Sequence, residues 1–134
     1  MNIIRINMYC KNCGTQITSG SKTGLCLACY KDYTKQMKIK HWQLTGDTGC
    51  SVATTLRNCI REYILLKQGR KCAICGLTDT WNGATLHFIL DHIDGNAANN
   101  QEDNLRLVCP NCDSQLNTYK SKNKNSARKH RKNY

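Results

Sequence analysis

The sequence has little of what a large hydrophobic core requires. It contains one Phe and one Pro in 134 residues, and aromatic side chains make up only 7% of the chain. Acidic residues are also scarce, since nine Asp and Glu stand against 20 Lys and Arg and leave a net charge of +11. No apolar run approaches the roughly 18 residues of a membrane span. These absences predict a small, basic protein that does not enter a membrane and needs another source of stability.

Cysteine is plentiful instead, with ten residues. In a secreted chain of this size they would indicate a disulfide framework. The N-terminal segment MNIIRINMYC does not favour secretion, because Arg5 and Asn7 interrupt any apolar signal region. We therefore expect a cytoplasmic protein, in whose reducing surroundings paired cysteines bind metal.

Eight of the cysteines form four C-x-x-C pairs, and these fall into two sets. The first set is Cys10, Cys13, Cys26 and Cys29, and the second is Cys72, Cys75, Cys109 and Cys112. One C-x-x-C turn brings two thiolates to a tetrahedral ion, and a second turn completes the shell. The alternative, a redox dithiol, requires a C-x-x-C beside a βαβ unit, which the sequence does not show. Two structural zinc ions are predicted, each contributing about 10–16 kcal/mol of apparent folding free energy.

The order of apolar and polar segments predicts a small α+β fold in four parts. These are an N-terminal zinc ribbon (1–30), linker helices (31–68), a domain around the second zinc site (69–120) and a basic flexible tail (121–134). The linker should contain a polar helix over 28–44 and a second helix that Ser51 caps and that ends near Gly69. In the third part we expect strands over 86–90 and 105–108 and a helix over 113–120.

This succession of strand, loop, strand, C-x-x-C and helix gathers four polar residues: Asp91, His92, Asn104 and Asp113. The segment that contains them, LDHIDGNAANNQEDNLRLVCPNCDSQLNTYKSKN from Leu90 to Asn123, resembles the HNH endonucleases, which are ββα-metal nucleases of phages and mobile introns. The resemblance covers roughly residues 60–125, and the N-terminal ribbon more weakly. It implies a ββα-metal motif between the two C-x-x-C pairs of the second set.

The resemblance also implies an activity and a role for each residue. The activity is metal-dependent hydrolysis of DNA, by a nicking or double-strand enzyme that could be a site-specific homing enzyme and that leaves 3′-hydroxyl and 5′-phosphate ends. His92 is the expected general base, and Asn104 is expected to brace the loop and orient His92. Asp91 and Asp113 are the expected ligands of the catalytic ion, although the family has His or Asn at the position of Asp113. Carboxylates at both positions favour Mg²⁺ or Mn²⁺, and Asn117, one helical turn further on, could add a ligand.

The basic residues predict double-stranded DNA as the partner. Residues 118–134 contain seven basic and no acidic side chains. Two groups are expected to follow the phosphate backbone: Lys35 and Lys38 from the linker, and Lys120, Lys122, Lys124, Arg128, Lys129, Arg131 and Lys132 from the C-terminal region. No obligate protein partner is evident, and a monomer is expected because the sequence shows no heptads. A phage-encoded protein would act in the host cytoplasm.

Two other functions fit the cysteines and the charge equally well. One is a zinc-ribbon protein that binds nucleic acid without catalysis, and the other is an accessory of phage packaging. Individual residues also have simpler interpretations: Asp113 could be a favourable charge at a helix N-terminus, Asp94 a turn former, and His87 a hydrogen-bonded core residue. Only Asp91, His92, Asn104 and Asp113, taken together, favour the nuclease.

Overall fold

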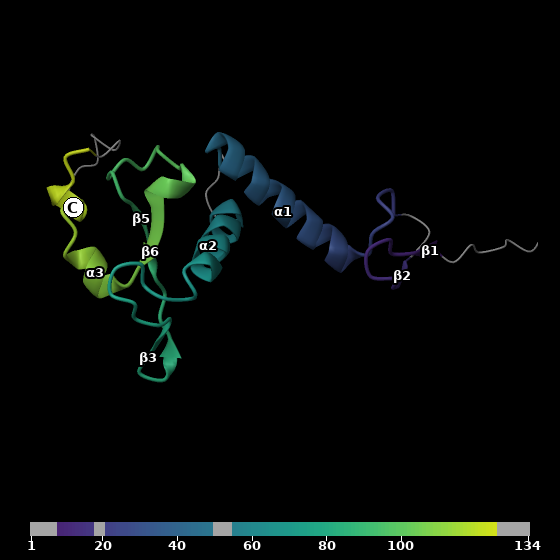
Figure 1. Cartoon of the computed structure of the whole chain (residues 1–134), viewed down its shortest axis with the longest axis horizontal. Coiled ribbons are helices and arrows are strands. Elements are labelled where there is room, and N and C mark those ends of the chain that lie inside the picture. The colour runs from purple at the N-terminus through teal and green to yellow at the C-terminus, as the bar shows by residue number, and fades with distance from the viewer. Residues whose placement is uncertain (1–7, 18–20, 50–54, 126–134) are drawn as a thin grey trace, which may run out of the picture. The chain divides into compact units, whose positions relative to one another are not determined.

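The computed structural model describes residues 8–17, 21–49 and 55–125, with the backbone alone at 55–57 and 121 (Figure 1). The chain divides into two compact units, Met1–Lys38 and Ile39–Tyr134. Both units contain short strands and helices, so the predicted small α+β fold with two four-cysteine sites is confirmed. No described helix is long and apolar enough to span a membrane.

The first unit is built around a tight ribbon. Strand β1 (Met8–Tyr9) pairs antiparallel with β2 (Gln16–Ile17), and the turn between them carries the first C-x-x-C. Gly14 has a φ of +73° in this turn, a conformation that favours glycine. Helix α1 (Leu27–Thr45) begins directly after Cys26 and continues into the second unit. On α1, Lys35 is half-buried and Lys38 is exposed.

The core of the second unit lies between helices and a two-stranded sheet. Strand β5 (Ile89–His92) pairs antiparallel with β6 (Leu105–Val108), and α2 (Thr55–Lys67) packs against β6 (Figure 1). Side chains at the 3.6-residue period of α2 and alternate residues of β6 meet in this core. Its buried members include Ile60, Ile64, Leu105 and Leu107, together with Trp42 from the end of α1.

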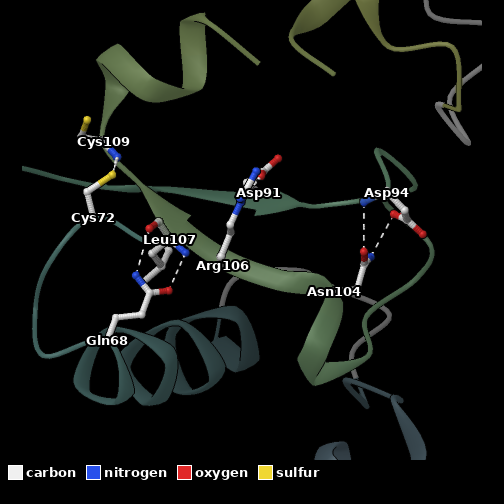
Figure 2. Close-up of polar contacts among 8 residues, drawn as sticks. All are labelled: Gln68, Cys72, Asp91, Asp94, Asn104, Arg106, Leu107 and Cys109. Atoms are coloured by element: carbon white, nitrogen blue, oxygen red, sulfur yellow. Dashed lines mark hydrogen bonds and ion pairs between the residues drawn. The ribbon is translucent and has the colours of Figure 1, made fainter. Parts of the chain in front are cut away.

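The side chain of Gln68, just after α2, hydrogen-bonds to the backbone of β6. Its Oε1 accepts the Leu107 N–H at 2.9 Å, and its Nε2 donates to the Leu107 carbonyl at 2.9 Å (Figure 2). The backbone groups of the buried Leu107 are therefore satisfied by the Gln68 amide and, at the carbonyl, also by the Ala73 N–H at 3.0 Å, which avoids the free-energy cost of unpaired polar groups.

The strands agree with the sequence-based expectation in one case and differ in the other. Strand β6 has the predicted bounds, whereas β5 begins at Ile89 instead of residue 86. Ile89 pairs with Val108, the last residue before Cys109 turns away toward its metal site. Residues 86–88 therefore have no partner on β6, and a separate small hairpin, β3 (Thr80–Trp81) and β4 (Ala84–Thr85), precedes them.

The predicted helix over 113–120 is wrong. Helix α3 spans Pro110–Ser114, turns follow, and a 3₁₀ segment, η2, spans Lys120–Lys122. Helix α3 starts where Cys109 accepts the Cys112 N–H, so the metal-binding turn itself forms the helix N-terminus. Lys120 has a φ of +50°, which no α-helix accommodates. Asn117 therefore does not lie one helical turn beyond Asp113.

A polar cluster joins the helices to the loop that follows β5. Glu102, on the 3₁₀ segment η1 (Glu102–Asn104), forms an ion pair with Lys67 at 2.5 Å and accepts hydrogen bonds from Tyr63 and Gln43, both at 3.0 Å. The Lys67 ammonium lowers the pKa of Glu102. Helices α1 and α2 are thereby tied to the segment that leads into β6. The predicted cap Ser51 and the predicted phosphate contacts Arg128, Lys129, Arg131 and Lys132 lie outside the described residues.

Candidate functional site

Both cysteine sets have the geometry of a four-thiolate metal site. Within each set the four sulfur atoms lie within 4.8 Å of one another. The Cys13–Cys26 and Cys75–Cys109 sulfur pairs are each 3.7 Å apart. Zinc–sulfur bonds of about 2.3 Å at tetrahedral angles place the sulfurs about 3.8 Å apart. Each set could therefore hold one zinc ion with little rearrangement.

The pKa values of two thiols in the second set are shifted in opposite directions. Burial raises the pKa of Cys72, but N–H groups of Cys109, Cys75 and Ile74 outweigh it and lower this pKa to about 6. The Cys109 N–H donates to the Cys72 sulfur at 3.2 Å (Figure 2). Burial and the neighbouring thiols raise the pKa of Cys112 to about 12. The fold thus favours a thiolate at Cys72 and disfavours one at Cys112. A divalent cation bound by the set would stabilise both thiolates.

Asp91, on β5, is a buried carboxylate with a cationic partner. It is 7% exposed, and its Oδ2 lies 2.7 Å from Nε of Arg106, the residue opposite it on β6 (Figure 2). Arg106 had no role in the sequence-based site. Its position could have been inferred only from the hairpin register, in which His92 pairs with Leu105 and Asp91 with Arg106.

Asp113 lies on α3, which contacts β5, and its electrostatics connect it to Asp91. Burial raises the pKa of Asp113, and the negative charge of Asp91 raises it further, while Lys120 lowers it. The two carboxylates are therefore close enough to repel each other, and a cation bound by both would relieve this repulsion. In the described part of the chain, only the two cysteine sets gather three or more acidic, His or Cys ligands. The Asp91–Asp113 pair could supply two oxygen ligands and leave positions for water or phosphate oxygens.

His92 ends β5 and is half-buried. Its Nε2 lies 3.0 Å from Oδ1 of Asn100, which is a contact that the sequence analysis missed. The loop contains four asparagines, at positions 96, 99, 100 and 104, and nothing in their order shows which one touches the imidazole. His87, predicted to be a core residue, is exposed.

The buried side chain of Asn104 holds, by hydrogen bonds, the loop that follows His92. It is 8% exposed, its Oδ1 accepts the Asp94 N–H at 3.0 Å, and its Nδ2 donates to Asp94 Oδ1 at 2.9 Å (Figure 2). Its carbonyl also accepts the Ile93 N–H at 2.9 Å. Asn104 thus holds the two residues that directly follow His92, while the imidazole itself contacts Asn100.

Asp94 is more than a turn former, because it joins the loop to Asn104. Hydrogen bonds from the Asn99 amide, the Asn96 N–H and the Asn104 amide lower its pKa below the ordinary 3.8. A carboxyl whose pKa is lowered by folding stabilises the fold above its ordinary pKa, and this contribution disappears as the pH falls through the folded value.

We therefore expect Asp94→Asn to lower the thermal midpoint by a few degrees near neutral pH. The difference from the wild type should narrow below about pH 4, where the wild-type carboxyl also becomes protonated. Thermal melts of both proteins across this pH range test the expectation. Asp103→Asn, which removes an exposed carboxylate from the neighbouring 3₁₀ segment, is the matched control. A difference that stays constant with pH would contradict the assignment.

The segment after α3 lies against the same loop. The Asn123 amide donates to the Gly95 carbonyl at 2.7 Å, and the Asn125 amide donates to the Asp94 carbonyl at 3.2 Å. A Cβ at Gly95 would lie 2.5 Å from Asn123 Oδ1, and the φ of +75° at this position also favours glycine. Along the same segment Lys120, Lys122 and Lys124 are exposed. We call this segment, residues 115–125, the strap. The lysines predicted to bind phosphate thus lie on the strap, which is hydrogen-bonded to the loop that follows His92. Asn117 is exposed in the preceding turn.

Comparison with known proteins supports the resemblance that the motif implied. Over 53 residues the chain is 45% identical to the H-N-H endonuclease F-TflIV of Escherichia phage T5, and the match covers 40% of this chain and 23% of the phage protein. No protein-family model matches the chain, and no solved structure matches it. The chain thus spans less than a quarter of the length of that curated relative. Over the matched part, it is similar to an HNH endonuclease.

Proposed function

We propose that this protein is a metal-dependent DNA endonuclease of the HNH type. The observation that carries the proposal is the hairpin of β5 and β6 with α3 after it, which places His92, Asp91 and Asp113 on neighbouring elements beside a four-cysteine site. The similarity to a phage H-N-H endonuclease supports the same assignment. In this proposal β5, β6 and α3 form the ββα-metal motif.

The chemistry follows from the residues of this motif. Asp91 and Asp113 would hold Mg²⁺ or Mn²⁺, which supplies positive charge for the phosphodiester and for its leaving 3′ oxygen. In its neutral form, the His92 imidazole would take a proton from the attacking water. Water attack with departure of the 3′ oxygen leaves 3′-hydroxyl and 5′-phosphate ends. Asn104 keeps the loop behind His92 in place.

Double-stranded DNA is held by lysines outside the motif. Lys120, Lys122 and Lys124 on the strap, together with the basic residues that follow, would contact the phosphate backbone near the scissile bond. Lys35 and Lys38 on α1 are proposed to contact phosphates as well. A homing or nicking role in a host cytoplasm is part of this proposal, and the phage origin of the matched endonuclease supports the host location.

Plasmid cleavage tests the proposal directly. Zinc-loaded protein is incubated with supercoiled plasmid in Mg²⁺, in Mn²⁺ and without a divalent ion, and the ends of the products are sequenced and labelled. We expect relaxed or linear DNA with 5′-phosphates only when Mg²⁺ or Mn²⁺ is present. Intact plasmid under conditions in which the protein demonstrably binds DNA would overturn the proposal.

Asp113 offers a prediction about the metal. Asp113→His places a nitrogen donor where the HNH family has His or Asn, and nitrogen suits softer ions than Mg²⁺. We expect the variant to keep its fold and its zinc, to lose about tenfold or more of its Mg²⁺-dependent cleavage, and to retain cleavage with Mn²⁺, Co²⁺ or Ni²⁺. Cleavage rates across these ions measure the change. An unchanged order of metal preference would show that Asp113 is not a ligand.

A second candidate is a zinc protein that binds nucleic acid without cutting it. The Arg106–Asp91 ion pair favours this candidate, because a guanidinium can neutralise the buried carboxylate without a metal ion. The two candidates differ in calorimetry: a nuclease should bind Mn²⁺ at a site that Asp91→Asn abolishes, whereas a non-catalytic protein should show no such site.

A further inference from the structure

We propose that Asn100 is a positioning residue, which holds the neutral His92 imidazole with its proton on Nε2 and leaves Nδ1 as the proton acceptor. The catalytic consequence rests on the proposed function, whereas the contact and the tautomer do not. The inference starts from one distance, 3.0 Å between His92 Nε2 and Asn100 Oδ1.

The contact selects one tautomer because an amide oxygen can only accept a hydrogen bond. A neutral imidazole carries its proton on one nitrogen and a lone pair on the other. With Oδ1 of Asn100 facing it, Nε2 must be the donor, so the lone pair is on Nδ1. A base needs this lone pair to take a proton from water. Asn100 therefore determines both the ring orientation and the nitrogen that can act as the base.

Asn100 can fix the ring only if it is itself fixed, and the structure shows how its backbone is held. The indole N–H of Trp42 donates to the Asn100 carbonyl at 2.6 Å. Trp42 is fully buried and packs edge-on against Tyr63, with the ring centroids 5.9 Å apart. On the other side, the Asn104 amide donates to the Asn99 carbonyl at 2.8 Å. Both peptide groups that flank the Asn100 Cα thus have their carbonyls held by buried side chains.

This arrangement gives α1 a role in the site beyond packing. Trp42 lies near the C-terminal end of α1. It is linked to His92 by Asn100 alone, because the Asn100 carbonyl accepts the indole N–H and the Asn100 side chain contacts the imidazole. A buried tryptophan usually finds a partner for its N–H. Here the partner is the residue that orients the proposed base.

The test observes the imidazole without DNA and without Mg²⁺. Zinc-loaded protein labelled with ¹⁵N in histidine is measured by two-bond ¹H–¹⁵N NMR about two pH units above the ordinary histidine pKa of about 6.5. The His92 signals are identified by their loss in His92→Ala, and exposed His87 is an internal reference. We expect His92 to carry its proton on Nε2, with an N–H resonance protected from exchange with water. In Asn100→Ala this protection should be lost, and in Asn100→Asp, which keeps the acceptor, it should remain.

Cleavage rates form the second measurement. Asn100→Ala should lower kcat by about 10–100-fold, by analogy with the hydrogen-bond partners of metal-binding histidines, with KM little changed. Asn100→Asp should recover most of this loss. Asn58→Ala, at an exposed position of α2, is the matched control and should have no effect on either measurement.

The two measurements separate this inference from the proposed function. A proton on Nδ1 of His92 in the wild type, or the same exchange protection in Asn100→Ala, would overturn the inference even if DNA is cleaved. Conversely, a protected Nε2–H that depends on Asn100 supports the positioning contact even if no cleavage is found, and only the proposed nuclease function then falls.

Discussion

Replacing His92 by Ala is expected to lower Mg²⁺-dependent DNA cleavage by about 10²–10⁴-fold, the usual contribution of general-base assistance. The side chain is half-buried at the end of β5 and its described hydrogen bond joins it to the loop at Asn100. Its removal leaves the cysteine sites and the core untouched, so zinc content and the far-UV spectrum should not change. DNA binding, measured without divalent ions, should also persist, since the proposed phosphate contacts are lysines.

His87→Ala is the matched control for this experiment. His87 precedes β5 by two residues and is exposed, so its loss should leave the cleavage rate within about twofold of the wild type. Initial rates of plasmid nicking for the three proteins, at equal zinc content, provide the measurement. If His92→Ala cut DNA as fast as His87→Ala, the imidazole would not be the base, and the proposed mechanism would have to be abandoned.

The second large effect is expected at the second cysteine set. Cys109 is 1% exposed and belongs both to the predicted zinc site and to the buried core. Loss of a structural zinc ion removes about 10–16 kcal/mol of apparent folding free energy, whereas a whole domain is stable by only about 5–15 kcal/mol. Cys109→Ser should therefore unfold the unit Ile39–Tyr134. A chelator strong enough to remove zinc from the wild type should do the same.

Two further substitutions make this experiment specific. Cys26→Ser disrupts the first set, which lies wholly within Met1–Lys38, so it should cost one zinc ion and leave the melting of the second unit in place. Cys59→Ser, on α2 and outside both sets, should keep both zinc ions and change stability by about 1 kcal/mol or less. Zinc content and thermal melts followed by circular dichroism distinguish the three variants. A cooperative melt of Cys109→Ser near the wild-type temperature would contradict a structural role for the site.

The parts of the fold that could be predicted from sequence are those that depend on local spacing. C-x-x-C pairs bring two thiols into one turn whatever surrounds them, and both predicted sets do gather in the structure. Strand β6 and the helical face of Ile60 and Ile64 also follow from periodicity. The start of α3 could not be predicted in this way, because it depends on the turn that Cys109 and Cys112 form around their site.

The candidate site shows the same division. Its acidic pair, its histidine and Asn104 could be proposed from the order of residues and a family resemblance. Arg106 could not, since its contact with Asp91 depends on the register between two strands separated by a long loop. Asn100 could not either, because it is one of several asparagines in that loop, and only the donor from Trp42, 58 residues earlier, selects its position.

By itself, then, the sequence determined the chemistry that is available: eight paired thiols, a histidine between carboxylates, and an excess of positive charge along the strap and α1. The tertiary structure decided which of these groups meet. It placed Arg106 beside Asp91, brought Asn100 within hydrogen-bond distance of the His92 imidazole, and brought the lysine-bearing strap into contact with Gly95. The physical reason is that ligand spacing and helical period act within a few residues, whereas strand register and buried hydrogen bonds are set only when distant segments pack together.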